Sequence, residues 1–258
     1  MTVSRIGVSR VDRARTPIVS ADEIIRRVLY RDGLMLVIDK PAGLAVHPGP
    51  KGGETLSDHL EALRFGLPRR PEVAHRLDKD TSGCLVLGRH AKALGRLGEL
   101  FKEGAVDKLY WAVVEGGPAE DQGEIALALG KRSAERGWWM KVDPKGQPAL
   151  TQWRVLGSGG EFTLLELRPI TGRTHQLRVH CAAMGWPIVG DAIYGTAPRF
   201  GGAGLQLHAR AVTVPIQPNK PPITVEAPVP VHMRERLDEL LISQRAEAIR
   251  EKRREPDA

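Results

Sequence analysis

A dense group of charged and polar side chains lies between His75 and Gly83, where the sequence reads HRLDKDTSG. Within it, Arg76 supplies a cation two positions before the carboxylate of Asp78, and a second acid follows at Asp80. An aspartate can act as a covalent nucleophile when a neighbouring cation keeps it ionised and aligned. The segment therefore predicts a reactive carboxylate, and the alternative interpretation is a polar surface turn that leads into a strand.

Other kinds of site fit the sequence less well. A serine hydrolase usually has a Gly-x-Ser-x-Gly turn, and the sequence contains none. A phosphate-binding loop ends in Gly-Lys-Ser/Thr, and the loop with Gly52 and Gly53 lacks that ending. His175 and His180 lie five positions apart rather than the four that align two metal ligands on one helix face. We therefore expect no metal site, and a single reactive carboxylate is the favoured chemistry.

Two predicted strands flank the reactive segment. Ser82 and Gly83 predict a tight turn, and the apolar run Cys84 to Leu87 directly after it predicts a buried strand. The segment from Lys108 to Glu115 is rich in aromatic and β-branched residues, which favours a central strand with Tyr110 on one of its faces. A polar loop braced by core strands is a common place for a functional site.

The remaining pattern predicts one large folded domain with both strands and helices. A basic leader is expected over residues 1–23, the folded domain over 24–232, and a helix with a charged tail over 233–258. A helix from Thr171 to Met184 carries several basic side chains, Arg178 among them. Further helices are expected over 55–65 and 91–101, and strands over 28–30, 34–39, 151–156, 161–167, 211–215 and 223–227.

Composition limits the class of protein. The chain has 258 residues and a net charge of +7, which permits a polyanionic partner without requiring one. Its two cysteines, without a CxxC pair, fit a reducing compartment, and its apolar runs are far too short to span a bilayer. Trp138 and Trp139 lie among Lys131, Arg132, Arg136 and Lys141, so they either stack on nucleic acid bases or belong to a β-hairpin.

Three ordered motifs together resemble the RluA family of pseudouridine synthases. They are HRLDKDTSG at His75, KLYWAVVEG at Lys108 and TGRTHQLRVH at Thr171, and the similarity extends from about Val28 to Ala227 through VLYRDGLMLVIDKPAGLAVHPG, PIVGDAIYG and LHA. The resemblance implies an α+β fold with a mixed, largely antiparallel central sheet and flanking helices. It also implies isomerisation of selected uridines in ribosomal RNA, transfer RNA or both, without a cofactor or metal, by a cytoplasmic and monomeric enzyme.

The resemblance also assigns roles to individual residues. Asp78 matches the catalytic nucleophile, although attack on the base and assistance to a glycal at the ribose both stay open. Arg178 matches the cation that pairs with this aspartate, which keeps a carboxylate charged in a dry pocket. Tyr110 matches a tyrosine that packs on the uracil, Arg76 matches an arginine that enters the RNA stack as the nucleotide flips out, and Leu177 would line the pocket. His75, Thr81, Ser82 and Arg173 match positions for which we expect structural roles.

Two other classes of function remain as alternatives. An inactive RNA-binding protein with the same fold would be expected to lose the pocket residues, yet Asp78, Tyr110 and Arg178 are all present. A glycoside hydrolase or nucleosidase would need a second acid to activate water, and no second acid has a matching position. The small RNA-binding module that precedes many members of the RluA family has no counterpart here, so substrate choice is expected to depend on the catalytic domain and the leader.

Overall fold

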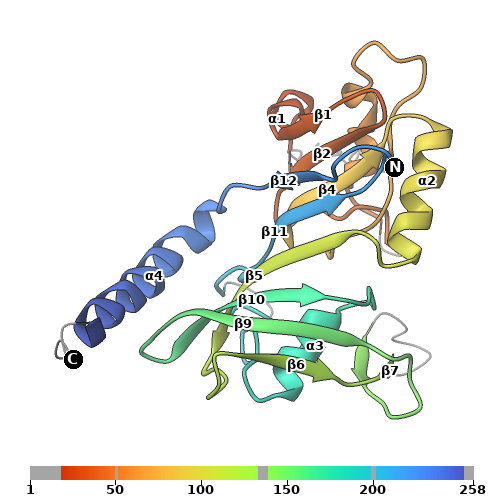
Figure 1. Ribbon diagram of the computed structural model, residues 1–258. Helices are drawn as coiled ribbons and strands as arrows, with labels where there is room; N and C mark the ends of the chain where they lie inside the picture. Colours follow the sequence, from red (N-terminus) through yellow and green to blue (C-terminus); the bar gives the residue numbers. More distant parts are fainter. Residues whose placement is uncertain (1–18, 50–51, 133–138, 199–201, 253–258) are drawn as a thin grey trace, which may run out of the picture.

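The chain folds around one large twisted sheet, as the computed structural model in Figure 1 shows. The structure describes residues 19–49, 52–132, 139–198 and 202–252, with side chains described as far as Leu241. Within these residues the sheet has ten strands, ordered β1-β2-β4-β11-β5-β10-β9-β6, with β12 paired to β11 and β3 paired to β4. All pairs are antiparallel except β4 with β11, so the predicted α+β fold with a largely antiparallel mixed sheet is confirmed.

The strands follow the apolar and β-branched runs of the sequence. Their bounds are β1 Val28–Arg31, β2 Met35–Lys40, β3 Glu72–Val73, β4 Ser82–Gly88, β5 Asp107–Glu115, β6 Gln122–Ala126, β9 Leu150–Gly159, β10 Phe162–Pro169, β11 Leu207–Val214 and β12 Ile223–Glu226. A separate hairpin is formed by β7 Leu129–Lys131 and β8 Met140–Val142. The helices are α1 Ala21–Arg26, α2 Ala91–Lys102, α3 Gln176–Ala183 and α4 Val231–Lys252.

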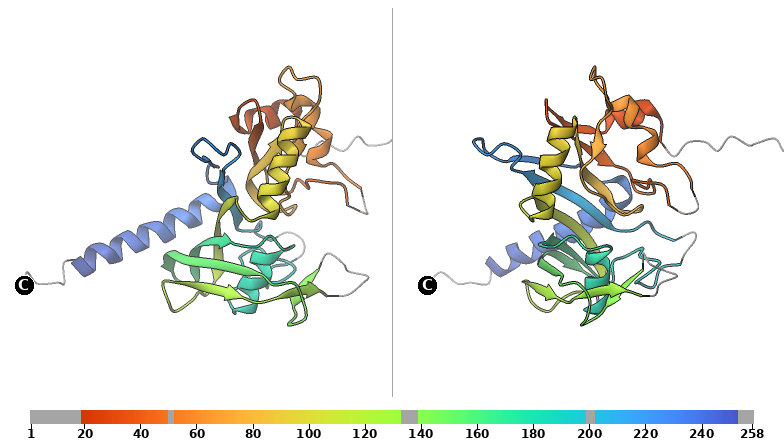
Figure 2. Two further views of the ribbon diagram at one scale, coloured as in Figure 1. Left: turned by 45° about the vertical axis from the view of Figure 1, so that its right-hand side comes forward. Right: turned by 90° about the vertical axis from the view of Figure 1, so that its right-hand side faces the viewer.

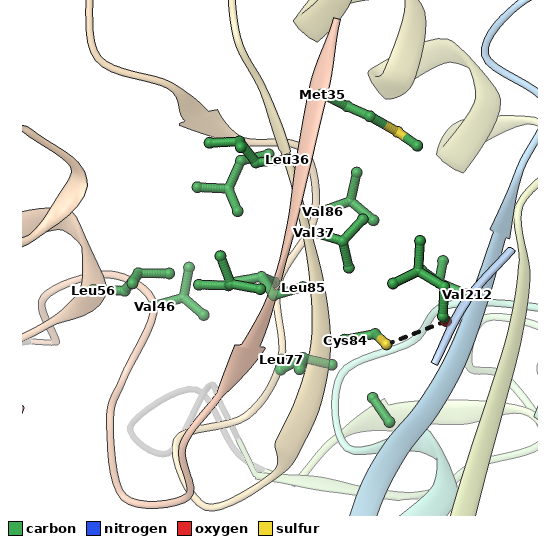
Figure 3. Packing of buried hydrophobic residues seen from close by; sticks show 14 of the residues in the cluster. Met35, Leu36, Val37, Val46, Leu56, Leu77, Cys84, Leu85, Val86 and Val212 are labelled. Carbon is green, nitrogen blue, oxygen red and sulfur yellow. Dashed lines mark hydrogen bonds between the residues drawn. The ribbon is translucent and has the colours of Figure 1, made fainter. Parts of the chain in front are cut away.

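Two apolar clusters lie on either side of the centre of the sheet. The first surrounds β2 and β4, and Figure 3 shows how Val37, Leu85 and Leu77 pack there with their neighbours. The second joins β5 and β10 to α3 and includes Leu177 and Leu207. Tyr110 on β5 packs against both clusters, which places its ring where the two halves of the fold meet. Figures 1 and 2 show these halves, with α2 beside one and α3 beside the other.

Gly83 allows β4 to lie close beside β11 just after the reactive segment. Its backbone φ is +104°, a conformation that residues with a side chain rarely adopt, and its partner across the parallel ladder is Ala209. A Cβ on Gly83 would collide with the carbonyl oxygen of Ala209. The approach of these two strands therefore depends on glycine at this position.

We expect Gly83→Ala to lower the free energy of unfolding by about 3 kcal/mol, because it combines backbone strain with a collision against main-chain atoms. Urea denaturation followed by circular dichroism measures this change. The matched control is Gly98→Ala in the exposed part of α2, where an added Cβ meets no atom within 4 Å. That change should stabilise the protein by up to about 1 kcal/mol, since alanine is the better helix former. Equal stability of the two variants would contradict the role of Gly83.

Two of the predicted helices are wrong in extent. Residues 55–65 form two short 3₁₀ turns, Leu56–Asp58 and Leu60–Leu63, because the Asp58 carboxylate accepts hydrogen bonds from the backbone and hydroxyl of Thr55 and tightens the first turn. The helix expected from Thr171 begins only at Gln176, since His175 has a left-handed φ of +53°. The predicted helix over 91–101 is confirmed by α2.

The domain boundaries expected at residues 24 and 233 both fall inside ordered structure. Helix α1 begins at Ala21, capped by Ser20, and Val19 before it is buried, so the folded region begins earlier than residue 24. Helix α4 packs Met233 and Leu237 against Leu164 of β10, which joins the beginning of this helix to the sheet. Figure 2 shows the rest of α4 extending away from the body. Most of the expected leader, residues 1–18, lies outside the described residues.

Trp139 lies directly before β8 of the β7–β8 hairpin. Trp139 is buried, with 8% of its surface exposed, and the guanidinium of Arg132 lies 5.5 Å from the centre of its ring. Trp138 and Arg136 lie outside the described residues. The hairpin interpretation therefore holds for Trp139, whose ring is too covered to stack on a base.

Candidate active site

A cavity of about 290 Å³ lies where the two halves of the fold meet. Most of its wall comes from the loop before β4, the first half of β5, and the stretch that leads into α3 together with the start of that helix. Phe101 of α2 and Leu207 of β11 complete the wall. Among the residues that line it are all five that the sequence singled out, namely Arg76, Asp78, Tyr110, Leu177 and Arg178. Residues that are far apart in the chain thus meet around one space of a size suited to a small ring system.

The loop that carries Asp78 is held in place by the apolar core and by hydrogen bonds. Leu77 is buried in the first apolar cluster, and the backbone N–H of Thr81 donates to the carbonyl of Asp78 to close a turn. Lys40, whose side chain is fully buried, donates hydrogen bonds from Nζ to the carbonyls of Pro41, Leu44 and Lys79, at 2.9, 2.8 and 3.0 Å. The amine therefore ties the end of β2 to the loop that carries Asp78.

Burial lowers the pKa of Lys40 to about 7, although the carboxylates of Asp80 and Asp78 partly offset this by raising it. Its three carbonyl partners match the three N–H donors of a protonated ammonium group. Sequence reasoning treated Lys40 only as part of the turn Lys-Pro-Ala-Gly that ends a strand. The available signal was a lysine two positions after an apolar run and directly before Pro-Ala-Gly.

Asp78 and Arg178 form the central ion pair of the site. Nη1 of Arg178 lies 3.3 Å from Oδ2 of Asp78, and the two residues are separated by 100 positions in the sequence. The other two nitrogens of the guanidinium, Nε and Nη2, donate to the two carboxylate oxygens of Asp191 at 2.8 Å each. Arg178 is 6% exposed and Asp191 is 0% exposed at the side chain, so a buried bidentate pair holds the cation that faces Asp78.

Asp191 is the principal site residue that sequence reasoning missed. Burial alone would raise the pKa of its carboxyl group, but the hydrogen bonds and charge of Arg178 outweigh this effect and lower the pKa. The backbone N–H groups of Ile193 and Tyr194 also donate to Oδ1. Asp191 lies in the motif PIVGDAIYG, which supported the family resemblance without suggesting a role for the acid.

His175 and Tyr194 add a second group of contacts beside Asp78. Nε2 of His175 lies 3.7 Å from Oδ2 of Asp78, and its Nδ1 is 2.8 Å from the hydroxyl of Tyr194, which accepts a hydrogen bond from the backbone N–H of Met140. Burial lowers the pKa of His175, while the charge of Asp78 partly offsets this by raising it. The net effect favours a neutral imidazole near pH 7.

Tyr110 forms an aromatic wall of the cavity. Burial, followed by the negative charge of Asp78, raises the pKa of its hydroxyl group, so the ring stays neutral at physiological pH. Leu177 of α3 and Leu207 of β11 extend the apolar region of the wall. Arg76 is exposed, and its side chain has no hydrogen-bond or ion-pair partner among the residues that the structure describes. The cavity thus combines an apolar wall, one carboxylate and an unconstrained cation.

Several motif residues have contacts that fit the structural roles expected for them. Nε2 of His75 accepts a hydrogen bond from the backbone N–H of Val86, and its ring stacks on Phe101 at 4.3 Å. The hydroxyl of Ser82 lies 2.9 Å from Nδ1 of His208 on β11. In the described stretches of the chain, no three His, Cys, Asp or Glu side chains form a group that would hold a metal ion. The same residues include no helix long and apolar enough to cross a membrane.

The fold is that of solved pseudouridylate synthases. The human RNA Pseudouridylate Synthase Domain Containing 1 superposes with a TM-score of 0.71 and is 29% identical, covering 94% of this chain and 100% of that chain. The human RNA Pseudouridylate Synthase Domain Containing 4 superposes with a TM-score of 0.69 at 28% identity, covering 84% of this chain and 95% of that chain.

Sequence comparison leads to the same family. A family model described as RNA pseudouridylate synthase matches residues 34–183. A protein of Zymomonas mobilis called an RNA pseudouridine synthase is 45% identical over 209 residues, which cover 80% of this chain and 95% of the relative. A ribosomal large subunit pseudouridine synthase C of Vibrio cholerae is 34% identical over 234 residues, covering 87% and 72%. The chain therefore belongs to the RNA pseudouridine synthases of the RluA type, an isomerase family, as the three motifs predicted.

Proposed function

We propose that Asp78 is the nucleophile with which this pseudouridine synthase isomerises selected uridines that have flipped out of an RNA stack. The observation that carries the proposal is the ion pair between Asp78 and Arg178 at the edge of a cavity walled by Tyr110. A carboxylate that loses some of its hydration remains ionised when a fixed cation faces it, and it is then available to react.

The reaction requires the uracil to be detached, turned and rejoined. The bond between N1 and C1′ breaks, a bond between C5 and C1′ forms, and a proton leaves C5 while N1 gains one. The aromatic wall formed by neutral Tyr110 suits this order of steps, because stacking holds the uracil ring in the cavity without fixing its rotation about the stacking axis. Attack by Asp78 on the base and assistance to a glycal at the ribose both fit this arrangement.

We propose ribosomal RNA as the first substrate to examine, with transfer RNA as the second. The support is that the Vibrio cholerae relative is named a ribosomal large subunit pseudouridine synthase C. A relative from Borreliella burgdorferi, 36% identical over 176 residues, is named a ribosomal large subunit pseudouridine synthase D. The net charge of +7 is compatible with either RNA.

The deciding experiment maps pseudouridine in total RNA from cells with and without this chain. The expected result is the loss of pseudouridine at one or a few positions, restored by the wild-type gene and not by an Asp78→Asn gene. Unchanged maps together with retained RNA binding would instead favour the inactive RNA-binding alternative. Release of free uracil would indicate a nucleosidase.

We propose that the enzyme is monomeric and acts in the cytoplasm. Its two free, buried cysteines support the choice of a reducing compartment.

Arg76→Ala is expected to reduce turnover more on a uridine in a structured stem or loop than on one in an unstructured oligonucleotide. Extruding a stacked base costs a few kcal/mol, and a side chain that fills the vacated space offsets some of this cost. We therefore expect about tenfold or more loss of kcat/KM on the structured RNA, and a smaller loss on the oligonucleotide. Steady-state kinetics on both substrates measure the difference. The control is Arg70→Ala, which removes an exposed cation outside the cavity. Equal losses for Arg76→Ala on the two RNAs would leave Arg76 as a general anchor for phosphate.

A further inference from the structure

The cavity holds more positive charge than its own acids balance. Four basic side chains line it, Arg76, Lys108, Arg173 and Arg178, against one lining carboxylate at Asp78. Arg178 is neutralised by Asp78 and Asp191. Within the described residues, Lys108 and Arg173 form no ion pair, and the acid next to Lys108, Asp107, is paired with Arg168 at 2.7 Å. Three cations of the site, Arg76, Lys108 and Arg173, therefore have no carboxylate partner among the described residues, and two of them, Lys108 and Arg173, are half-buried.

Lys108 lines the cavity close to Tyr110. It is two residues before Tyr110 on β5, so the two side chains leave the same face of the strand, and about 6.5 Å of strand separates them. Its Nζ reaches the loop before α3, because a Cβ built on Gly172 would lie 3.9 Å from it. Burial lowers the pKa of Lys108 and the charge of Asp107 only partly offsets this, as expected for an ammonium group that has lost water.

Arg173 directly follows Gly172 in that loop and also lines the cavity. Its Nε donates to the carbonyl of Pro148 at 3.0 Å, which holds the guanidinium by one edge. Its two terminal nitrogens make no hydrogen bond within the described stretches of the chain, and the side chain is half-buried along the cavity wall. The free edge of a guanidinium held in this way suits bidentate recognition of a phosphate.

The loop that carries Arg173 is held rigid by the buried side chain of Gln176. Its Oε1 accepts hydrogen bonds from the hydroxyl of Thr171 at 2.7 Å and from the backbone N–H of Arg173 at 3.0 Å. Its Nε2 donates to the carbonyl of Leu150 and the hydroxyl of Thr151. The position of Arg173 is thus set before any ligand arrives, which lowers the entropy cost of binding.

We propose that Lys108 and Arg173 form a subsite for one phosphodiester group next to the target uridine. This inference rests on the proposed function, since it places the nucleotide's base against Tyr110 and its adjoining phosphate between the two cations. A phosphodiester accompanies every internal uridine of an RNA, so the subsite holds the nucleotide by a group that is present in every sequence. It differs from exposed Arg76 in being half-buried, where a charge-assisted hydrogen bond is less screened by salt.

The test removes either the cation or the phosphate charge, and then both. Binding is measured by fluorescence anisotropy in an Asp78→Asn background, so that turnover does not interfere. The probe is a short RNA centred on the uridine that the wild-type enzyme modifies, or on a single uridine flanked by adenosines if mapping finds none. Two further probes carry an uncharged methylphosphonate in place of the phosphate on the 5′ or the 3′ side of that uridine.

We expect one of the two methylphosphonates to weaken binding about tenfold or more. Lys108→Met should weaken binding to the unmodified RNA by a similar factor and then show little further loss with that methylphosphonate. Lys108→Arg keeps a charge and should keep most of the sensitivity. The control Lys102→Met removes an exposed cation from the end of α2, outside the cavity, and should stay as sensitive as the parent.

The subsite would be overturned if Lys108→Met kept full sensitivity to the methylphosphonate that weakens binding of the parent protein. It would also be overturned if neither methylphosphonate weakened binding of the parent protein. Arg173→Met provides a second test if Lys108→Met fails to fold, because its side chain has a single hydrogen bond to the protein within the described residues. The two proposals fail differently. The absence of any pseudouridine in the mapping experiment contradicts the proposed function, whereas the binding cycle measures the subsite whether or not turnover occurs.

Discussion

We expect Asp78→Asn to abolish pseudouridine formation, with a loss in kcat of about 10⁴-fold or more. The amide has nearly the same volume as the carboxylate but is a poor nucleophile. Arg178 keeps its bidentate partner Asp191 in this variant, so no buried cation is left without a carboxylate. We therefore expect the free energy of unfolding to change by less than about 1 kcal/mol. Release of tritium from RNA labelled at C5 of uridine measures turnover.

The matched control for this change is Asp80→Asn. Asp80 lies in the same loop but is exposed and does not line the cavity. Its variant should retain turnover close to that of the wild type, which would show that the loop tolerates the loss of a carboxylate. Substantial residual turnover of purified Asp78→Asn would contradict the nucleophile assignment, and equal inactivation of both variants would point to a structural role for the loop.

Arg178→Met is expected to reduce both turnover and stability, for two separate reasons. Turnover falls because Asp78 loses the cation that faces it at 3.3 Å. Stability falls because the carboxylate of Asp191, 0% exposed at the side chain, loses both of its hydrogen bonds from Arg178. Leaving one partner of a buried ion pair unpaired costs about 3–5 kcal/mol. Thermal and urea denaturation measure the second effect, and single-turnover kinetics measure the first.

A double variant separates these two effects. Arg178→Met combined with Asp191→Asn removes the unpaired buried charge, while an amide oxygen remains to accept from the backbone N–H groups of Ile193 and Tyr194. Most of the lost stability should return, whereas turnover should stay low because Asp78 still lacks its cation. Recovery of both stability and turnover would reduce Arg178 to a structural residue.

The dependence of RNA affinity on salt in Arg178→Met should equal that of the wild type. A shallower dependence would make Arg178 a phosphate contact.

Local patterns in the sequence predict the reactive loop and the strands beside it. Asp78 stands in a short segment whose turn residues and following apolar run constrain one another locally, so no distant residue is needed to predict a polar loop before β4. The alternation along β5 also places Tyr110 on a definite face. The motifs, through their resemblance to a family, extended this to the α+β fold and to the pairing of Asp78 with Arg178.

The surroundings of the pair formed by Asp78 and Arg178 depend on how distant segments pack together. Asp191 and Lys40 hold site residues in place, and Lys108 lines the cavity. Periodicity does not relate the segments that meet there, because a repeat of 2 or 3.6 residues describes one element and not its neighbours. The start of α3 was also missed, since the side chain of Gln176 bonds to Thr171 and to the backbone of Arg173 and so competes with the helix over the preceding turn. Burial shifts the pKa values of Lys40, His175 and Tyr110, and the loss of hydration that causes these shifts depends on how the whole chain packs.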